Sequence, residues 1–145
     1  MGMPDRLFID TNILVYIANE DSDFHRKVVS GFKRTSSTYE LWTSRQVLRE
    51  YAVVMTRPDI MEKPLSLNEV ISDIEKWQTI LQIADENEEV TKALLELIAT
   101  HQVKGKRIHD ANIVASMKVN SIARLWTMNV QDFQGITETE VISEP

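Results

Sequence analysis

The sequence of 145 residues contains no cysteine. Disulfide bonds, thiolate-bound zinc and a cysteine nucleophile are therefore excluded, and a reducing compartment fits this composition. The sequence also lacks any apolar stretch close to the roughly 20 residues that span a bilayer. Its first residues, 1–6, do not show the basic and then apolar pattern of a secretory signal. We therefore expect a cytoplasmic protein that is not inserted in a membrane.

Glycine and proline are scarce as well, with four of each, and neither is clustered as in a linker or a low-complexity segment. The length is that of one ordinary domain, and 43% of the residues are hydrophobic, which is enough to build a core. We therefore expect a single domain that covers residues 5–143.

Positive charge is in the minority, because 16 Lys and Arg residues face 22 Asp and Glu residues and the formal net charge is −6. This balance disfavours a protein that coats nucleic acid through charge alone. It weighs less against a metallonuclease, whose acidic side chains gather around a cation that meets the phosphate. The charge alone therefore leaves nucleic-acid chemistry open.

Short apolar runs alternate with helical patterns along the whole chain. We expect strands at residues 7–9, 39–43, 79–84, 123–127 and 140–142, with a helical continuation as the alternative at 79–84. We expect helices at residues 13–18, 24–34, 46–55, 67–77, 88–103 and 108–118. Asn12 and Ser44 are the expected N-terminal caps of the first and third helices, and Pro58 should end the third helix near Arg57. This alternation predicts an α/β domain with a mainly parallel sheet.

Polar residues follow two of the expected strands, at Asp10-Thr11-Asn12 and at residues 127–133. In parallel α/β sheets the ligand binds beyond the carboxyl ends of the strands. Asp10 lies between an apolar strand and an apolar helix, and a buried carboxylate costs several kcal/mol unless it is paired or binds a metal. The alternative is that Asp10 only caps the following helix.

Two further acids, Glu50 and Asp110, lie at the borders of the apolar faces of their helices. The alternative for Asp110 is an acid in the first turn of a helix, where it interacts favourably with the helix dipole. The alternative for Glu50 is an ordinary exposed acid on a helix surface. Asn129 and Asp132 also fit a polar turn after a strand. None of these residues is decisive alone.

Together, in this order, they resemble the PIN domain family. The matching segments are residues 8–14, 44–51, 109–115 and 126–133, which span nearly the whole chain. Each motif is short, but four in the family's order and spacing make a fairly specific combination. The resemblance implies a three-layer α/β/α domain with a central, mainly parallel sheet of four or five strands.

The resemblance also implies an endoribonuclease that depends on Mg²⁺ or Mn²⁺ and acts on single-stranded or structured RNA. By position, Asp10, Glu50 and Asp110 look like its three core metal ligands, and either Asp132 or Asn129 takes the fourth place. Magnesium is a hard cation that prefers oxygen ligands, and such an ion can activate water and polarise a phosphoryl group. The groups expected to orient these ligands are Thr11, Asn12, Thr127 and Asn129.

Basic residues close to these motifs are candidate RNA contacts, namely Arg45, Arg49, Lys104, Lys106 and Arg107. The run at 104–107 leads into Asp110, so phosphates near the metal could meet it. A solvated connection between helices is the alternative. The three histidines do not form a convincing acid–base pair, and we expect them to be structural.

Small PIN proteins of this length are often toxins of VapBC-type pairs, which would imply a small antitoxin covering the acidic groove and a homodimer. A catalytically weak PIN-like module that binds nucleic acid or protein is the alternative, and Asn129 in an expected acidic place leaves it open. A haloacid-dehalogenase-type phosphatase is disfavoured, because Asn12 stands where its general acid would be. A phosphate receiver domain is disfavoured as well, because Met128 rather than lysine follows Thr127.

Overall fold

The computed structural model describes residues 4–136 and 139–145. Its strands form one five-stranded sheet in the order β3-β2-β1-β4-β5, and every neighbouring pair is parallel. The strands are β1 (Arg6–Ile9), β2 (Glu40–Ser44), β3 (Gln82–Ala84), β4 (Arg124–Trp126) and β5 (Glu140–Ile142). The α-helices are α1 (Thr11–Ala18), α2 (His25–Ser36), α3 (Arg45–Thr56), α4 (Leu67–Ile80), α5 (Glu88–His101) and α6 (Arg107–Val119). A short 3₁₀ helix, η1 (Val130–Phe133), follows β4.

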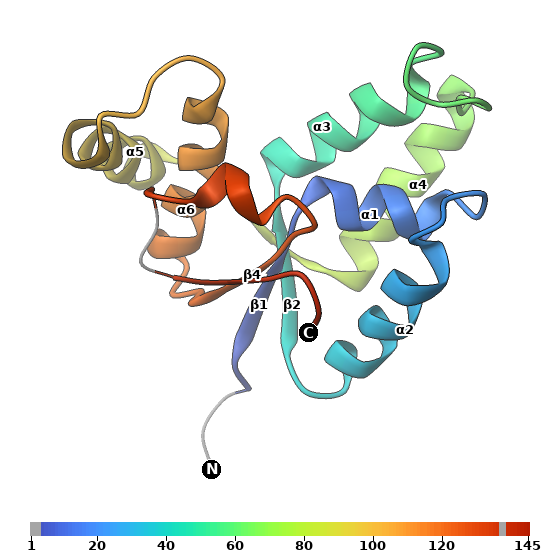
Figure 1. Cartoon of the computed structure of the whole chain (residues 1–145), viewed down its shortest axis with the longest axis horizontal. Coiled ribbons are helices and arrows are strands. Elements are labelled where there is room, and N and C mark those ends of the chain that lie inside the picture. The colour runs from blue at the N-terminus through green and yellow to red at the C-terminus, as the bar shows by residue number, and fades with distance from the viewer. Residues whose placement is uncertain (1–3, 137–138) are drawn as a thin grey trace.

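The helices cover both faces of the sheet, as Figure 1 shows, with α1 to α4 on one side and α5 and α6 on the other. The chain runs from β1 outward to β2 and β3 and then returns across the sheet to β4 and β5. Because parallel crossovers are right-handed, this reversal places the two sets of helices on opposite faces. The central strand β1 is fully buried at Leu7, Phe8 and Ile9. The three-layer α/β/α domain with a parallel central sheet is thereby confirmed.

Helix α3 begins and ends where the sequence predicts. The Ser44 side chain accepts a hydrogen bond from the Val47 backbone N–H and caps the helix. The helix ends at Thr56 with Arg57 as its C-cap, directly before Pro58, whose ring disfavours a helical residue before it. These two signals fix the helix that carries Glu50.

Two local predictions were wrong. The N-terminal cap of α1 is Asp10, whose side chain accepts from the Thr11 backbone N–H, while Asn12 lies inside the helix and its side chain reaches the end of β4. Strand β3 begins at Gln82 rather than at residue 79, because α4 continues to Ile80. Helical spacing buries Trp77 and Leu81 while residues 79 and 80 stay exposed, so the helical alternative is correct there.

The longest helices are α4 and α5, with 14 residues each. A membrane span needs about 20 predominantly apolar residues. Within the described part of the chain, no helix has the length and apolar character needed to cross a membrane.

Candidate active site

The carboxyl ends of β1 and β4 form the crevice of this sheet. The two strands are parallel neighbours, and the chain leaves β1 toward one edge but enters β4 on the other side. Such a reversal of strand order opens a crevice beyond the strand ends. The Asp10 backbone N–H donates to the Trp126 carbonyl at 3.1 Å, so Asp10 and Thr127 lie side by side at this point.

Asp10 is held there by neutral donors. Its Oδ1 accepts from the Thr11 backbone N–H at 2.8 Å, and its Oδ2 accepts from Thr127 Oγ1 at 2.7 Å and from Asn12 Nδ2 at 3.3 Å. The side chain is only 6% exposed. Burial raises the pKa of Asp10 to about 6, the hydrogen bonds from Thr127 and Thr11 oppose the rise, and the charges of nearby acids add to it. A buried carboxylate with only neutral donors is one that a cation would stabilise.

The side chains of Asn12 and Thr127 join the two strand ends. Asn12 Oδ1 accepts from the Met128 backbone N–H at 2.9 Å, and Asn12 Nδ2 donates to Thr127 Oγ1 at 3.0 Å. Thr127 Oγ1 also accepts from the Asn129 backbone N–H at 3.0 Å while it donates to Asp10. The orientation of the Asp10 carboxylate therefore depends on a network that crosses from β1 to β4.

Glu50 is brought to the same place by α3. Its Oε2 accepts from Thr11 Oγ1 at 2.7 Å, and its Oε1 accepts from Gln46 Nε2 at 2.9 Å. Gln46 also bonds to α6 through the His109 carbonyl and the Asn112 side chain. The sequence analysis missed Gln46 and Asn112, although the place of Gln46 one helical turn before Glu50 was a signal that the two side chains meet.

Asp110 enters from the first turn of α6 and is half-buried. Burial raises the pKa of Asp110 to about 6, the negative charges of Asp132, Asp10 and Glu50 add to the rise, and the Arg107 guanidinium opposes it. Among these charges the one on Asp132 acts most strongly on Asp110. Asp110 therefore lies within the field of the other three carboxylates.

A single cavity of about 750 Å³ collects these side chains. Its polar lining includes Asp10, Thr11, Asn12, Gln46, Glu50, His109, Asp110, Asn129 and Asp132. The predicted acids thus meet at one place, from β1, α3, α6 and η1. Asn129 and Asp132 both line the cavity and are exposed, so either can face a ligand there.

The chemistry of this lining fits a hard divalent cation. In the described part of the chain, Asp10, Glu50, Asp110 and Asp132 form no ion pair with a basic side chain. Across residues 4–136 and 139–145, no three acidic or histidine side chains already form a group that could hold an ion. Asp10 and Glu50 instead turn toward neutral partners. Carboxylate, hydroxyl and amide oxygens are nevertheless the donors that Mg²⁺ and Mn²⁺ prefer.

Basic residues lie on both sides of the cavity. On α3, Arg49 lines the cavity and lies 3.6 Å from Glu86, whereas Arg45 is bonded to Asp85 and Gln78. On the α6 side, Lys104 and Lys106 are exposed in the turn before the helix, and Arg107 donates to the Gln134 carbonyl. Of the five predicted RNA contacts only Arg49 lines the cavity, and Arg45 and Arg107 already have partners within the chain.

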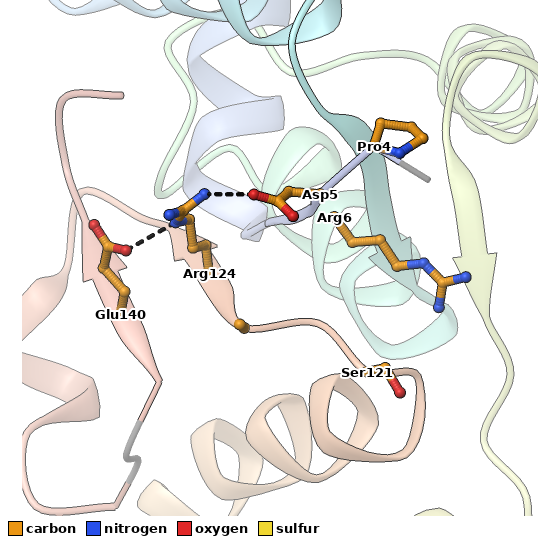
Figure 2. A pocket seen from close by; sticks show the side chains of 7 residues that line it. Pro4, Asp5, Arg6, Ser121, Arg124 and Glu140 are labelled. Atoms are coloured by element: carbon orange, nitrogen blue, oxygen red, sulfur yellow. Dashed lines mark hydrogen bonds and ion pairs between the residues drawn. The ribbon is translucent and has the colours of Figure 1, made fainter. Parts of the chain in front are cut away.

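A second hollow, of about 450 Å³, lies at the opposite ends of the strands (Figure 2). Its Arg124 is paired with Asp5 at 3.2 Å and with Glu140 at 2.8 Å. The Arg6 side chain extends away from Arg124 and pairs with Glu40. Because both arginines are already neutralised by carboxylates, this hollow is the weaker candidate.

Comparison with known proteins agrees with the motifs. The family model described as PIN domain matches residues 7–136, which is most of the chain. The chain belongs to the PIN domain family. This PIN domain is 24% identical over 128 residues to the curated protein Ribonuclease VapC24 of Mycobacterium tuberculosis (strain CDC 1551 / Oshkosh), with 88% of each chain covered.

Solved structures show the same PIN fold. One is VapBC2 from Rickettsia felis bound to a DNA fragment from their promoter, with a TM-score of 0.71, 19% identity, and coverage of 94% of this chain and 97% of that chain. Another is a toxin-antitoxin complex from Klebsiella pneumoniae, with a TM-score of 0.61, 17% identity, and coverage of 96% and 98%. At these identities the likeness concerns the fold alone.

Proposed function

We propose that this PIN domain is a cytoplasmic, divalent-metal-dependent endoribonuclease that hydrolyses RNA phosphodiester bonds. The observation that carries the proposal is the convergence of four carboxylates on one cavity, without a basic partner among the described residues. Membership of the PIN domain family and the similarity to a protein named a ribonuclease support RNA as the substrate.

In this proposal Asp10, Glu50 and Asp110 hold Mg²⁺ or Mn²⁺, and Asp132 rather than Asn129 supplies the fourth carboxylate. The charge of Asp132 acts on Asp110 more than that of Asp10 or Glu50, which supports that choice, because the Asn129 amide carries no charge to offer the ion. When bound, the ion would polarise a phosphoryl oxygen and lower the pKa of a water molecule. Thr127 and Thr11 orient the Asp10 and Glu50 carboxylates through their hydroxyl groups.

A cleavage assay on single-stranded RNA with Mg²⁺ or Mn²⁺ tests the activity. We expect Asp10→Asn to lower the rate at least about 100-fold, because changing groups that only orient metal ligands already costs about 10- to 100-fold. Asp23→Asn makes the same chemical change at an exposed residue between α1 and α2 and should leave the rate unaltered. An absence of metal-dependent cleavage by the unmodified protein would favour the alternative of a binding module.

The same cavity also has an apolar wall, which supports a protein partner. It is formed by Val15, Tyr16, Val53, Val54, Ile60 and Met61. Val53 is 53% and Ile60 is 51% exposed, so part of this apolar wall is open to solvent, and a contiguous exposed apolar surface is typical of a protein-interaction site. We propose that a segment of a small antitoxin covers this groove, in line with the fold's likeness to a toxin-antitoxin complex.

Expression in a host cell tests the partner. We expect growth arrest when the PIN domain is produced alone. We also expect a gene for a short DNA-binding protein immediately upstream, and relief of the arrest when its product is produced as well. Arrest that persists with that protein present would count against the pair. We also expect a homodimer, so light scattering should give twice the chain mass of 16.7 kDa.

A further inference from the structure

The Gln46 carboxamide is buried in the wall of the candidate site, and all of its hydrogen bonds go to groups of α3 and α6. The side chain is 3% exposed. Its Nε2 donates to Glu50 Oε1 and to the His109 carbonyl, both at 2.9 Å. Its Oε1 accepts from Asn112 Nδ2 at 2.7 Å. Each polar atom of this amide is therefore satisfied, as a buried polar group requires.

The surrounding groups allow only one orientation of this amide. Glu50 and the His109 carbonyl offer only acceptors, so the NH₂ end must face them. The oxygen must then face Asn112, which is forced to present its own NH₂ group. A glutamate at position 46 would lose both donated bonds and place a second negative charge beside Glu50.

The amide also connects two helices that lie on opposite faces of the sheet, α3 and α6 (Figure 1). Within the described residues, the bonds of Gln46 to His109 and Asn112 are the only hydrogen bonds between these helices. Glu50 comes from one helix and Asp110 from the other. The distance between these two carboxylates therefore depends on the bridge that Gln46 forms.

We propose that Gln46, with Asn112 as its partner, is a positioning residue that fixes Glu50 and sets the α3–α6 spacing, and thereby the size of the cation that the site accepts. This inference rests on the proposed function. Both oxygens of Glu50 are engaged, one by Gln46 and one by Thr11, so the carboxylate has little freedom to adapt. Mg²⁺ demands near-ideal octahedral geometry at about 2.0–2.1 Å, whereas Ca²⁺ accepts irregular sites at about 2.3–2.6 Å, and Mn²⁺ is also smaller than Ca²⁺. Loosening the bridge should therefore harm binding of the smaller ion more.

Direct binding of Mn²⁺, measured by electron paramagnetic resonance without RNA, and its displacement by Ca²⁺ test the inference. We expect Gln46→Met, which keeps the length but removes all polar atoms, to weaken Mn²⁺ binding about 10- to 100-fold. Ca²⁺ binding should weaken less than the binding of Mn²⁺. Asn112→Leu should weaken Mn²⁺ binding to a smaller extent, because the bond between Gln46 and Glu50 stays. The double variant should be no weaker than Gln46→Met, since both changes break the same link.

Val47→Ala is the matched control, because Val47 is a fully buried neighbour on α3 that does not line the cavity. It should lower the melting temperature without changing the preference for Mn²⁺ over Ca²⁺. The positioning role would be overturned if Gln46→Met weakened the binding of Mn²⁺ and Ca²⁺ by the same factor. It would also be overturned if Val47→Ala changed the preference for Mn²⁺ over Ca²⁺ as much as Gln46→Met does. In both cases the proposed function would stand. If Gln46→Met does not fold, an unchanged Mn²⁺ affinity in Asn112→Leu overturns it in the same way. If the unmodified protein binds no Mn²⁺, the proposed function itself fails and this inference fails with it.

Discussion

Asp10 and Asp110 share a property that links the site to the stability of the fold. Each has its pKa raised from 3.8 to about 6 in the folded chain, mainly by burial. A carboxyl group with a raised pKa holds its proton in the folded state at pH values where the unfolded chain has already lost it. The free energy of unfolding of the metal-free protein should therefore fall as the pH rises from about 4 to about 6. Above that range it should stay at its lowered value.

Asp110→Asn should accordingly stabilise the metal-free protein at neutral pH. A shift of about two pKa units corresponds to about 3 kcal/mol, and we discount it to about 1 kcal/mol because Asp110 is only half-buried. We expect the melting temperature at pH 7.5 to rise by about 3 °C and the gain to shrink toward pH 4. Mn²⁺ should raise the melting temperature of the unmodified protein but not that of the variant. A variant that melts lower at pH 7.5 would contradict the destabilisation that burial and the neighbouring negative charges impose on the Asp110 carboxylate.

The single residues of the site were predictable from the sequence only in part. Asp10, Glu50 and Asp110 could be grouped because their motifs occur in the family's order, although each also had an ordinary structural reading. For Asp10 the two readings turned out to be compatible, since it caps α1 and lines the cavity. Gln46 and Asn112 could not be found in this way. Their bond joins residues 66 positions apart, and it depends on how α3 and α6 are placed, which no local pattern encodes.

At the scale of secondary-structure elements, prediction succeeded where a local signal acts alone. Ser44 and Pro58 delimit α3 because capping and proline sterics act over a few residues. The start of α1 was misassigned, since Asp10, Thr11 and Asn12 are all able to cap a helix. Long-range hydrogen bonds determine which of them caps α1, because the Asn12 side chain is bonded to the Met128 backbone N–H and to Thr127 Oγ1. Tertiary contacts thus override local preference at the ends that build the site.

Helix α2 packs closely against the sheet at Gly31, which lies next to the Trp126 ring. A Cβ atom added at Gly31 would lie 2.9 Å from the Trp126 ring, which is rigid and fully buried. Alanine favours a helix over glycine by about 1 kcal/mol, but overpacking a core costs about 1–3 kcal/mol. We therefore expect Gly31→Ala to lower the free energy of unfolding, as measured by urea denaturation. Ser30→Ala, at the exposed neighbouring position, should have little effect, and a stabilised Gly31→Ala would show that α2 can move away from the sheet.

The same change should reach the site, because Trp126 directly precedes Thr127. A displaced ring would shift the end of β4 and with it the hydroxyl group that holds Asp10. We expect the metal-dependent cleavage rate of Gly31→Ala to fall even at temperatures where the variant is folded. An unaltered rate would show that the network of Asn12 and Thr127 isolates the carboxylate from the packing beneath it.

At the scale of the whole molecule, a chain with a net charge of −6 must still attract a polyanion if it cleaves RNA. Electrostatic attraction must then come from a local arrangement of charge rather than from the total. Lys104 and Lys106 are exposed in the turn before α6, and no hydrogen bond or ion pair in residues 4–136 and 139–145 engages their side chains. Arg45 and Arg107, in contrast, are already bonded within the chain. Among the five candidate RNA contacts, the two lysines are therefore the ones whose side chains are free to meet phosphates.

Replacing both lysines, as Lys104→Gln and Lys106→Gln together, should raise KM for single-stranded RNA and leave kcat nearly unchanged, because the carboxylates stay in place. Each lost contact to a single strand removes about 0.7 from the slope of log affinity against log salt, so the double variant should lose about 1.4. The control is Lys33→Gln with Lys76→Gln, which changes the net charge equally at exposed residues of α2 and α4. If the control alters the salt dependence as much, attraction depends on the total charge. If neither pair alters it, RNA reaches the carboxylates along the α3 side, where Arg49 lines the cavity.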